Sequence, residues 1–326
     1  DTGWAILSRY GSLTKALGWP QMFGTSIDAA PPPVIVASTM VLIINTLGLI
    51  SGAAILVMTI VNIYMPSFAI DALLAKNMIF FFGHVFINAT IYMAVIAVYE
   101  ILPTYTGRPW KTSKPFLIAW NASLIMVLAV YPHHLLMDFV MPTWALILGQ
   151  IMSYTSGLPV LVVTGLGVLI NVSRSGIRWD MTSGLLFLAT LGWAVGVVPA
   201  IVDGTIVANA VLHNTLWVPG HFHTYLLIGQ VTMVFGFMYF VAARPDSSGD
   251  TTLDRLAFWV FAAASFGFTM TFLYAGKASI PRRFAEHLPQ WTGQDQVGAF
   301  FAALVIVAVL VFVIRFFVRL GRPKTA

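Results

Sequence analysis

Long apolar runs separated by short polar segments make up most of this chain. A helix needs about 20 apolar residues to cross the hydrocarbon core of a bilayer. Runs of that length occur at 34–64, 77–102, 115–138, 143–172, 181–202, 210–243, 253–276 and 295–320. The pattern predicts an all-α membrane protein with eight transmembrane helices over residues 34–320. An extramembrane loop at 1–33 precedes them, and a short tail at 321–326 follows.

Composition supports a membrane protein and narrows its chemistry. Only 9% of the residues are charged, whereas a soluble domain carries about 25%. The absence of cysteine excludes disulfides, iron–sulfur clusters and thiolate copper sites from this chain. No basic run is long enough to follow a phosphate backbone, which argues against nucleic-acid binding. Because the first residue is Asp1 rather than Met, we expect a fragment or a split gene product.

Lys and Arg are divided unevenly between the two sides of the predicted helices. The poorer side holds four cations: Lys76, Lys277, Arg282 and Arg283. The richer side holds thirteen: Arg9, Lys15, Arg108, Lys111, Lys114, Arg174, Arg178, Arg244, Arg255, Arg315, Arg319, Arg322 and Lys324. Cytoplasmic loops carry the excess of Lys and Arg, so the richer side and the C terminus are predicted to be cytoplasmic.

Histidines gather at one depth of the predicted bundle. Six of them lie on three helices, near the helix ends at the poorer, outer side: His84, His133, His134, His213, His221 and His223. Ionisable groups inside a membrane are costly and usually mark function. A single histidine would be read as a packing residue, but six at one depth indicate metal binding.

The spacing of these histidines suggests how they bind metals. His221 and His223 are two apart, so on one helix they point about 200° from each other and could each bind a different heme iron. His133 and His134 are adjacent and follow Pro132, which disturbs helical hydrogen bonding. With His84 they could form a three-nitrogen site, which suits copper, iron or zinc.

Four motifs, in the same order along the chain, resemble the heme–copper oxidase family. The run HNTLWVPGHFH at 213–223 is similar to its tenth helix, especially in the B-type group. Gly83-His84 and His133-His134 resemble its copper-ligand helices, and Ile280-Pro281-Arg282-Arg283 resembles its heme-propionate arginine pair. The likeness runs from about 34 to 320. It implies helices V to XII of the catalytic subunit of a respiratory electron-transport enzyme in a prokaryotic plasma membrane.

The resemblance implies a role for each of these residues. His221 would bind the high-spin heme and His223 the low-spin heme, while His84, His133 and His134 would hold a copper. Arg282 and Arg283 would neutralise heme propionates; the alternative for both is interfacial snorkelling. His213, with Asp203 and Asn209 near it, is similar to the propionate and proton-exit region. His287 matches no ligand of the family and is expected to be a loop residue.

Two departures from the family pattern matter. The second ligand of the low-spin heme comes from an early helix, so another chain or segment supplying helices I–IV is expected as a partner. Oxygen-reducing members also carry a tyrosine near the copper, where this chain has Asn88 or Val127. Nitric oxide reductases lack that tyrosine. The resemblance therefore favours reduction of nitric oxide to nitrous oxide, with dioxygen reduction to water by a terminal oxidase as the alternative.

Asn88 and Tyr131 bear on the metal and the substrate. Nitric oxide reductases place a glutamate where this chain has Asn88, and that glutamate helps to bind a non-heme iron. The neutral Asn88 favours copper over non-heme iron. Tyr131 lies two residues before His133 and could replace the missing phenol in an oxidase, or be an ordinary buried aromatic residue.

Proton and electron supply complete the expectations. Tyr99 and Glu100 lie about 22 Å along the helix from His84 at 1.5 Å per residue, and Thr112 follows. They are expected to form a proton path, in which Tyr99 and Thr112 resemble residues of the B-type oxidases. The alternative for Tyr99 and Glu100 is that they anchor the helix at the interface. Electrons would come from a copper- or heme c-bearing subunit or from quinol. A transporter or a heme-free structural subunit is the remaining alternative, although the chain has no paired repeats.

Overall fold

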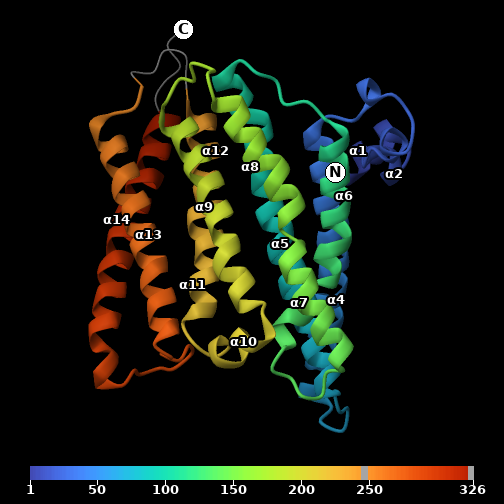
Figure 1. Cartoon of the computed structure of the whole chain (residues 1–326), viewed down its shortest axis with the longest axis vertical. Helices are drawn as coiled ribbons and strands as arrows, with labels where there is room; N and C mark the ends of the chain where they lie inside the picture. Colours follow the sequence, from blue (N-terminus) through green and yellow to red (C-terminus); the bar gives the residue numbers. More distant parts are fainter. Residues whose placement is uncertain (244–248, 322–326) are drawn as a thin grey trace. The chain divides into compact units, whose positions relative to one another are not determined.

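Eight membrane-length helices form most of the structure, a computed structural model that describes residues 1–243 and 249–321 (Figure 1). These helices are long and apolar enough to cross a bilayer, and the described residues contain no strand. Both findings confirm the predicted all-α fold. Arg244, Arg322 and Lys324, which the charge count used, lie outside the described residues, as does the predicted tail after Gly321.

The eight spans match the predicted apolar runs, and four of them are built from successive helical pieces. They are α4 (Pro33–Tyr64), α5 (Ala72–Thr106), α6 (Lys114–Ala129) with η2 (Tyr131–Leu135), α7 (Thr143–Thr155) with α8 (Leu158–Val172), α9 (Met181–Asp203), α11 (Trp217–His223) with η3 (Thr224–Val231) and α12 (Thr232–Ala242), α13 (Thr252–Lys277), and α14 (Thr292–Leu320) after the short η4 (Pro289–Trp291).

Two helix boundaries differ from the prediction. The α-helix of the span expected at 115–138 ends at Ala129 and a 3₁₀ helix follows from Tyr131, because Pro132 has no N–H to donate to the carbonyl four residues earlier. The span expected from residue 210 begins instead at Trp217, after the separate short helix α10 (Ile206–Leu212). Both boundaries lie next to the histidines, which the sequence pattern placed on continuous helices.

The first 33 residues, expected as a loop, contain the short helices α1 (Thr2–Tyr10), α2 (Leu13–Ala16), α3 (Trp19–Met22) and η1 (Ile27–Ala29). The side chain of Asn121 on α6 anchors them. Its amide donates to Leu17 O at 3.0 Å and its Oδ1 accepts from Trp19 Nε1 at 2.7 Å. That this segment lies outside the membrane stays a prediction.

The chain divides into two compact units. The first unit comprises Asp1–Ile96, Trp110–Thr164 and Gly204–Ala210, and the second comprises Ala97–Pro109, Gly165–Asp203 and Val211–Ala326. In the first unit α4 packs closely on α5 at Gly48 and Gly52, where an added Cβ would meet Val85 and Phe82. Such small residues let membrane helices approach each other closely.

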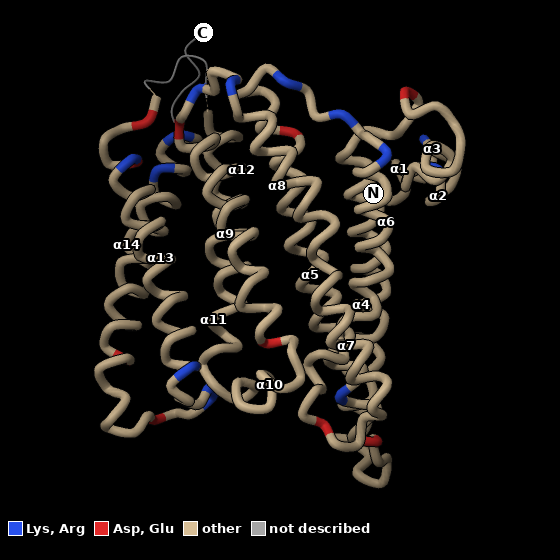
Figure 2. Tube along the Cα trace, in the orientation of Figure 1, with Lys and Arg blue, Asp and Glu red and all other residues tan. Residues whose placement is uncertain are grey.

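In the second unit, α9 packs against the π-helix η3 and α12, and α13 packs against α14. The π-helix follows His223 directly, and π-helical turns are rare and frequent at functional sites. The core between α9, α12, α13 and α14 is apolar and includes Leu185, Tyr239, Phe261 and Phe312. Long stretches of the helices carry no charge (Figure 2).

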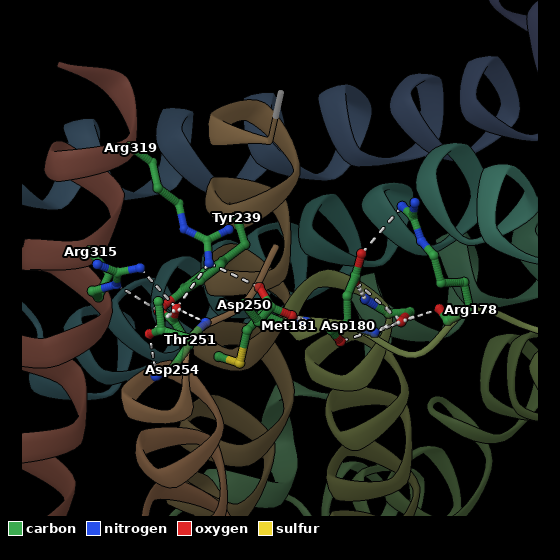
Figure 3. Close-up of polar contacts among 10 residues, drawn as sticks. Arg178, Asp180, Met181, Tyr239, Asp250, Thr251, Asp254, Arg315 and Arg319 are labelled. Carbon is green, nitrogen blue, oxygen red and sulfur yellow. Dashed lines mark hydrogen bonds and ion pairs between the residues drawn. The ribbon is translucent and has the colours of Figure 1, made fainter. Parts of the chain in front are cut away.

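Asp254, fully buried at the start of α13, holds the ends of three helices of the second unit together (Figure 3). Its carboxylate accepts two hydrogen bonds from Arg315, at 3.0 and 3.1 Å, one from Arg319 at 3.0 Å and one from the Tyr239 hydroxyl at 2.9 Å. Arg319 also pairs with Asp250 at 2.9 Å. Paired in this way, the buried charges do not stand alone in an apolar environment.

Candidate metal centres

Three histidines of the first unit converge on one point. His84 comes from α5, and His133 and His134 come from the 3₁₀ turn η2. One ring nitrogen of each lies within 4.8 Å of the others, and the ring centroids are 4.3 to 5.1 Å apart. Nitrogens that share one ion at bonds of about 2.0–2.1 Å lie at most about 4.2 Å apart. Small ring rotations therefore suffice to bring all three onto one metal.

Neighbouring side chains hold the three imidazoles in place. Ser153 Oγ on α7 lies 2.5 Å from Nδ1 of His133. Asn88 Nδ2 lies 3.0 Å from Nδ1 of His84 and also donates to the His84 carbonyl at 2.9 Å. The His134 ring stacks on Phe80, with centroids 5.3 Å apart. The Ser153 hydroxyl can accept the second ring N–H of His133, which is the kind of contact that orients a metal-binding histidine, whereas the Asn88 amide can only donate to Nδ1 of His84.

Helix α7 comes close enough for its Ser153 contact because of Gly149, one turn earlier. A Cβ at Gly149 would lie 2.7 Å from the backbone nitrogen of His133 and 2.9 Å from the carbonyl carbon of Pro132. Only glycine allows this approach. The turn that carries the two adjacent histidines is thus packed directly onto α7.

The three imidazoles and their surroundings fit copper. All the converging ligands are neutral nitrogens, and imidazole suits copper, iron and zinc. Asn88 has an amide in place of a carboxylate, and this amide contacts the His84 ring. It therefore adds no anionic ligand to the three imidazoles. Tyr131, the candidate for the missing phenol, donates its hydroxyl to Asn77 Oδ1 at 3.0 Å.

In the second unit, the two histidines of α11 face different helices. His221 Nδ1 lies 3.1 Å from Asp203 Oδ2 at the end of α9. The His223 ring stacks on Phe272 of α13 at 5.4 Å, and its Nδ1–H donates to Pro219 O at 2.7 Å. With Nδ1 of His223 occupied, its Nε2 is left to bind a metal. The contacts agree with the predicted divergence of the two side chains.

The arginine pair lies beside the start of α11. Arg282 N donates to Asn214 O at 2.9 Å, and Leu216 N donates to Ile280 O at 2.9 Å, so the two segments run side by side. The buried Nε of Arg282 has no hydrogen-bond partner among the residues that the structure describes. An unpaired buried guanidinium nitrogen fits an anionic group such as a heme propionate.

Nearby positive charges act on both His213 and Arg282. Burial, with the nearby Arg282, lowers the pKa of His213, while Asp203 opposes this shift. Burial and the adjacent Arg283 lower the pKa of Arg282. This part of the second unit is therefore rich in positive charge. Asn209, expected near His213, is a buried residue of α10 in the first unit.

The residues expected on the proton path differ in burial and in their hydrogen bonds. Tyr99 is buried, whereas its neighbour Glu100 is exposed. Thr112 donates its hydroxyl proton to Pro31 O at 2.6 Å and so holds the N-terminal segment. His287, expected as a loop residue, lies before α14 and pairs with Asp295 at 2.7 Å.

Sequence reasoning missed two polar partners. The contact of Ser153 with His133 was not foreseen, because 20 residues and a helix boundary separate them. The contact of Asp203 with His221 was not foreseen either, although Asp203 was expected near His213, with which it interacts electrostatically. The only sequence signal for Ser153 was its place four residues after Gly149, on the same face of a helix.

Comparison with known proteins identifies the family of the chain. The family described as cytochrome c and quinol oxidase polypeptide I matches residues 15–313. The heme-copper oxidase subunit I+III of Aeropyrum pernix is 26% identical over 238 residues, which is 70% of this chain and 28% of that protein. The cytochrome c oxidase subunit 1 of Cereibacter sphaeroides is 24% identical over 280 residues, covering 79% and 47%. The chain spans about half or less of the length of these relatives.

A solved structure shows the same fold. It is a heme-copper terminal oxidase dimer determined by cryo-EM, with a TM-score of 0.73 and 20% identity. The match covers 89% of this chain and 57% of that one. Since the family pattern extends over nearly the whole sequence, the chain belongs to the cytochrome c and quinol oxidase polypeptide I family, the subunit I family of heme–copper oxidases.

Proposed function

We propose that this chain is the part of a respiratory heme–copper oxidoreductase that carries its gas-reducing centre. The observation that carries the proposal is the convergence of His84, His133 and His134 on one point, with each ring held by a neighbour. A heme-free structural subunit has no use for such a site.

The proposed substrate is dioxygen, which is reduced to water. The relatives are named cytochrome c oxidases or heme-copper oxidases, and the similar solved structure is named a terminal oxidase. These names support the oxidase alternative over the nitric oxide reduction favoured from sequence. Nitric oxide is the second candidate, because Asn88 contacts His84 where oxygen-reducing members would carry a phenol.

The proposal assigns a role to each of the candidate site residues. His84, His133 and His134 hold copper, while His221 and His223 each bind a heme iron. Arg282 and Arg283 pair with the propionates. Bound hemes and copper supply the electrons and the binding site for the gas. Tyr99, Glu100 and Thr112 are proposed to mark the route by which protons enter.

The proposal includes partners and an orientation. Five histidines are assigned as ligands, so the second ligand of the His223 heme has to come from another chain or segment. Electrons arrive from a copper- or heme c-bearing subunit or from quinol. The side richer in Lys and Arg is proposed to face the cytoplasm of a prokaryote.

Gas electrodes test the proposed substrate directly. The protein is purified from its native membrane with its partner chains, and supplied with a chemical reductant and a redox mediator. The proposal expects reduced-heme absorption bands and consumption of dioxygen to water that greatly exceeds nitrous oxide formation from nitric oxide. Rapid nitrous oxide formation with slow dioxygen consumption would favour the second candidate. Absent heme bands would reject both.

A further inference from the structure

A carboxylate faces the ring nitrogen of His221 that a heme iron would not use. Asp203 Oδ2 lies 3.1 Å from His221 Nδ1, and the two side chains are only 12% and 16% exposed. The distance fits a hydrogen bond, although the hydrogen on Nδ1 does not point directly at the carboxylate. A small rotation of the ring would align the two groups.

The structure holds Asp203 in this position from several directions. Asp203 is the last residue of α9. One turn earlier, the carbonyl of Pro199 accepts a hydrogen bond from Trp217 Nε1, at 3.1 Å, and Trp217 begins the helix that carries His221. At Gly196 an added Cβ would meet the ring of Tyr225 at 3.2 Å. The end of α9 is therefore joined to α11 and η3 on both sides of the contact.

Asp203 lies near basic side chains of the second unit. Arg282 and His213 are both close enough to interact with it electrostatically. An anionic acceptor beside Nδ1 is a stronger hydrogen-bond partner than a neutral carbonyl.

We propose that Asp203 is a positioning residue that accepts the Nδ1–H of His221 and thereby sets the electron donation of this histidine to the heme iron. The inference rests on the proposed function and deepens it. With the proton held on Nδ1, the Nε2 lone pair binds iron. The carboxylate makes the imidazole more basic, because it stabilises partial loss of the Nδ1 proton. A more basic ligand stabilises the oxidised iron and lowers its midpoint potential.

This role differs from the one expected from sequence, in which Asp203 belongs to the propionate and proton-exit region. It also differs from a purely structural role. A carboxylate that only ends α9 would change stability when replaced, but it would leave the bond between His221 and iron unchanged.

Two variants and a matched control test the proposal on the purified holoenzyme with its partner chains. Asp203→Asn removes the negative charge and keeps the size of the side chain. Asp295→Asn does the same to another aspartate of the second unit, which pairs with Nδ1 of His287 at 2.7 Å. The readouts are the iron–histidine stretching frequency of the reduced high-spin heme, by resonance Raman spectroscopy, and the midpoint potential of that heme.

Asp203→Asn is expected to lower the stretching frequency and raise the midpoint potential, while Asp295→Asn matches the unmodified protein in both. Asp203→Glu keeps the charge but changes the geometry, so it is expected to shift the frequency in the same direction by less. This variant carries the test if Asp203→Asn fails to retain heme. Unchanged frequencies in the Asp203 variants would overturn the inference. Loss of the proposed function is recognised separately, as the absence of a high-spin heme in the unmodified protein.

Discussion

Ser153 Oγ lies 2.5 Å from Nδ1 of His133, so a hydroxyl on α7 is paired with a histidine of the three-imidazole site. When His133 Nδ1–H donates to this hydroxyl, Nε2 is the ring nitrogen whose lone pair can bind copper. The contact links the packing of α7 at Gly149 to the orientation of a metal ligand.

Replacing Ser153 therefore weakens copper binding. Ser153→Ala removes the acceptor, and loss of such a partner typically costs about 10- to 100-fold in metal affinity. Ser153→Thr keeps the hydroxyl and serves as the control. The measurement is copper retained by the purified protein during dialysis against graded chelator concentrations. Equal retention in the Ala and Thr variants would show that the hydroxyl does not orient His133.

Asp254 is expected to dominate stability at its end of the second unit. Asp254→Asn leaves Arg315 and Arg319 without their shared anion, and removing one partner of a buried pair costs about 3–5 kcal/mol. The control is Asp180→Asn, because Asp180 pairs with the exposed Arg178 (Figure 3) and such pairs contribute about 0–1 kcal/mol.

The measurement for this pair of variants is thermal unfolding in detergent. Asp254→Asn should lower the midpoint by many degrees, and Asp180→Asn should leave it almost unchanged. Similar midpoints for the two variants would mean that the buried network contributes little beyond what packing already provides.

A salt bridge next to the histidine turn gives a pH dependence. Lys76 Nζ lies 2.6 Å from Asp138 Oδ2. The hydrogen bond from Lys76 is the main cause that holds the pKa of Asp138 below its ordinary value of 3.8. A lowered folded-state pKa contributes stability that is complete above the unfolded pKa and is lost as the pH falls through the folded value.

Thermal midpoints of the unmodified protein and of Asp138→Asn test this contribution. The two curves should differ above about pH 5 and converge as the pH falls below 3.8. A constant difference across that range would assign the effect to packing rather than to the charge.

Tyr99 and Glu100 are adjacent in sequence but differ in solvent exposure. Tyr99 is 3% exposed, whereas Glu100 is exposed at the surface of α5. Tyr99→Phe removes a buried hydroxyl and is expected to lower turnover by at least about tenfold, as loss of a proton-transfer group does. Tyr64→Phe, at an exposed tyrosine of α4 outside the proposed path, is the control and should keep most of the activity. The assay is steady-state dioxygen consumption; equal rates in both variants would remove Tyr99 from the proton path.

The amino-acid pattern was sufficient to predict the eight spans and the meeting of His84 with the His133 pair, because apolar length and histidine depth are properties of sequence. It could not place the end of α6 or the start of α11, where proline and a separate short helix interrupt the apolar runs. Contacts such as Ser153 with His133 and Asp203 with His221 depend on how helices pack, and the spacing along the chain does not encode them.

The substrate is a second property that the sequence alone did not determine. The absence of a phenol at Asn88 favoured nitric oxide, whereas the named relatives support dioxygen. A single position near a metal changes local chemistry without fixing the substrate. Tyr131, which donates its hydroxyl to Asn77 within the same unit, places a phenol in the turn that carries His133 and His134.

Metal content tests the central claim most directly. The protein, purified with its partner chains, is analysed for iron and copper per copy of this chain, with and without His84→Ala. The account predicts at least two irons and one copper in the unmodified protein, with the variant losing the copper and keeping the irons. Copper that persists without His84, or a protein that binds neither metal, would contradict it.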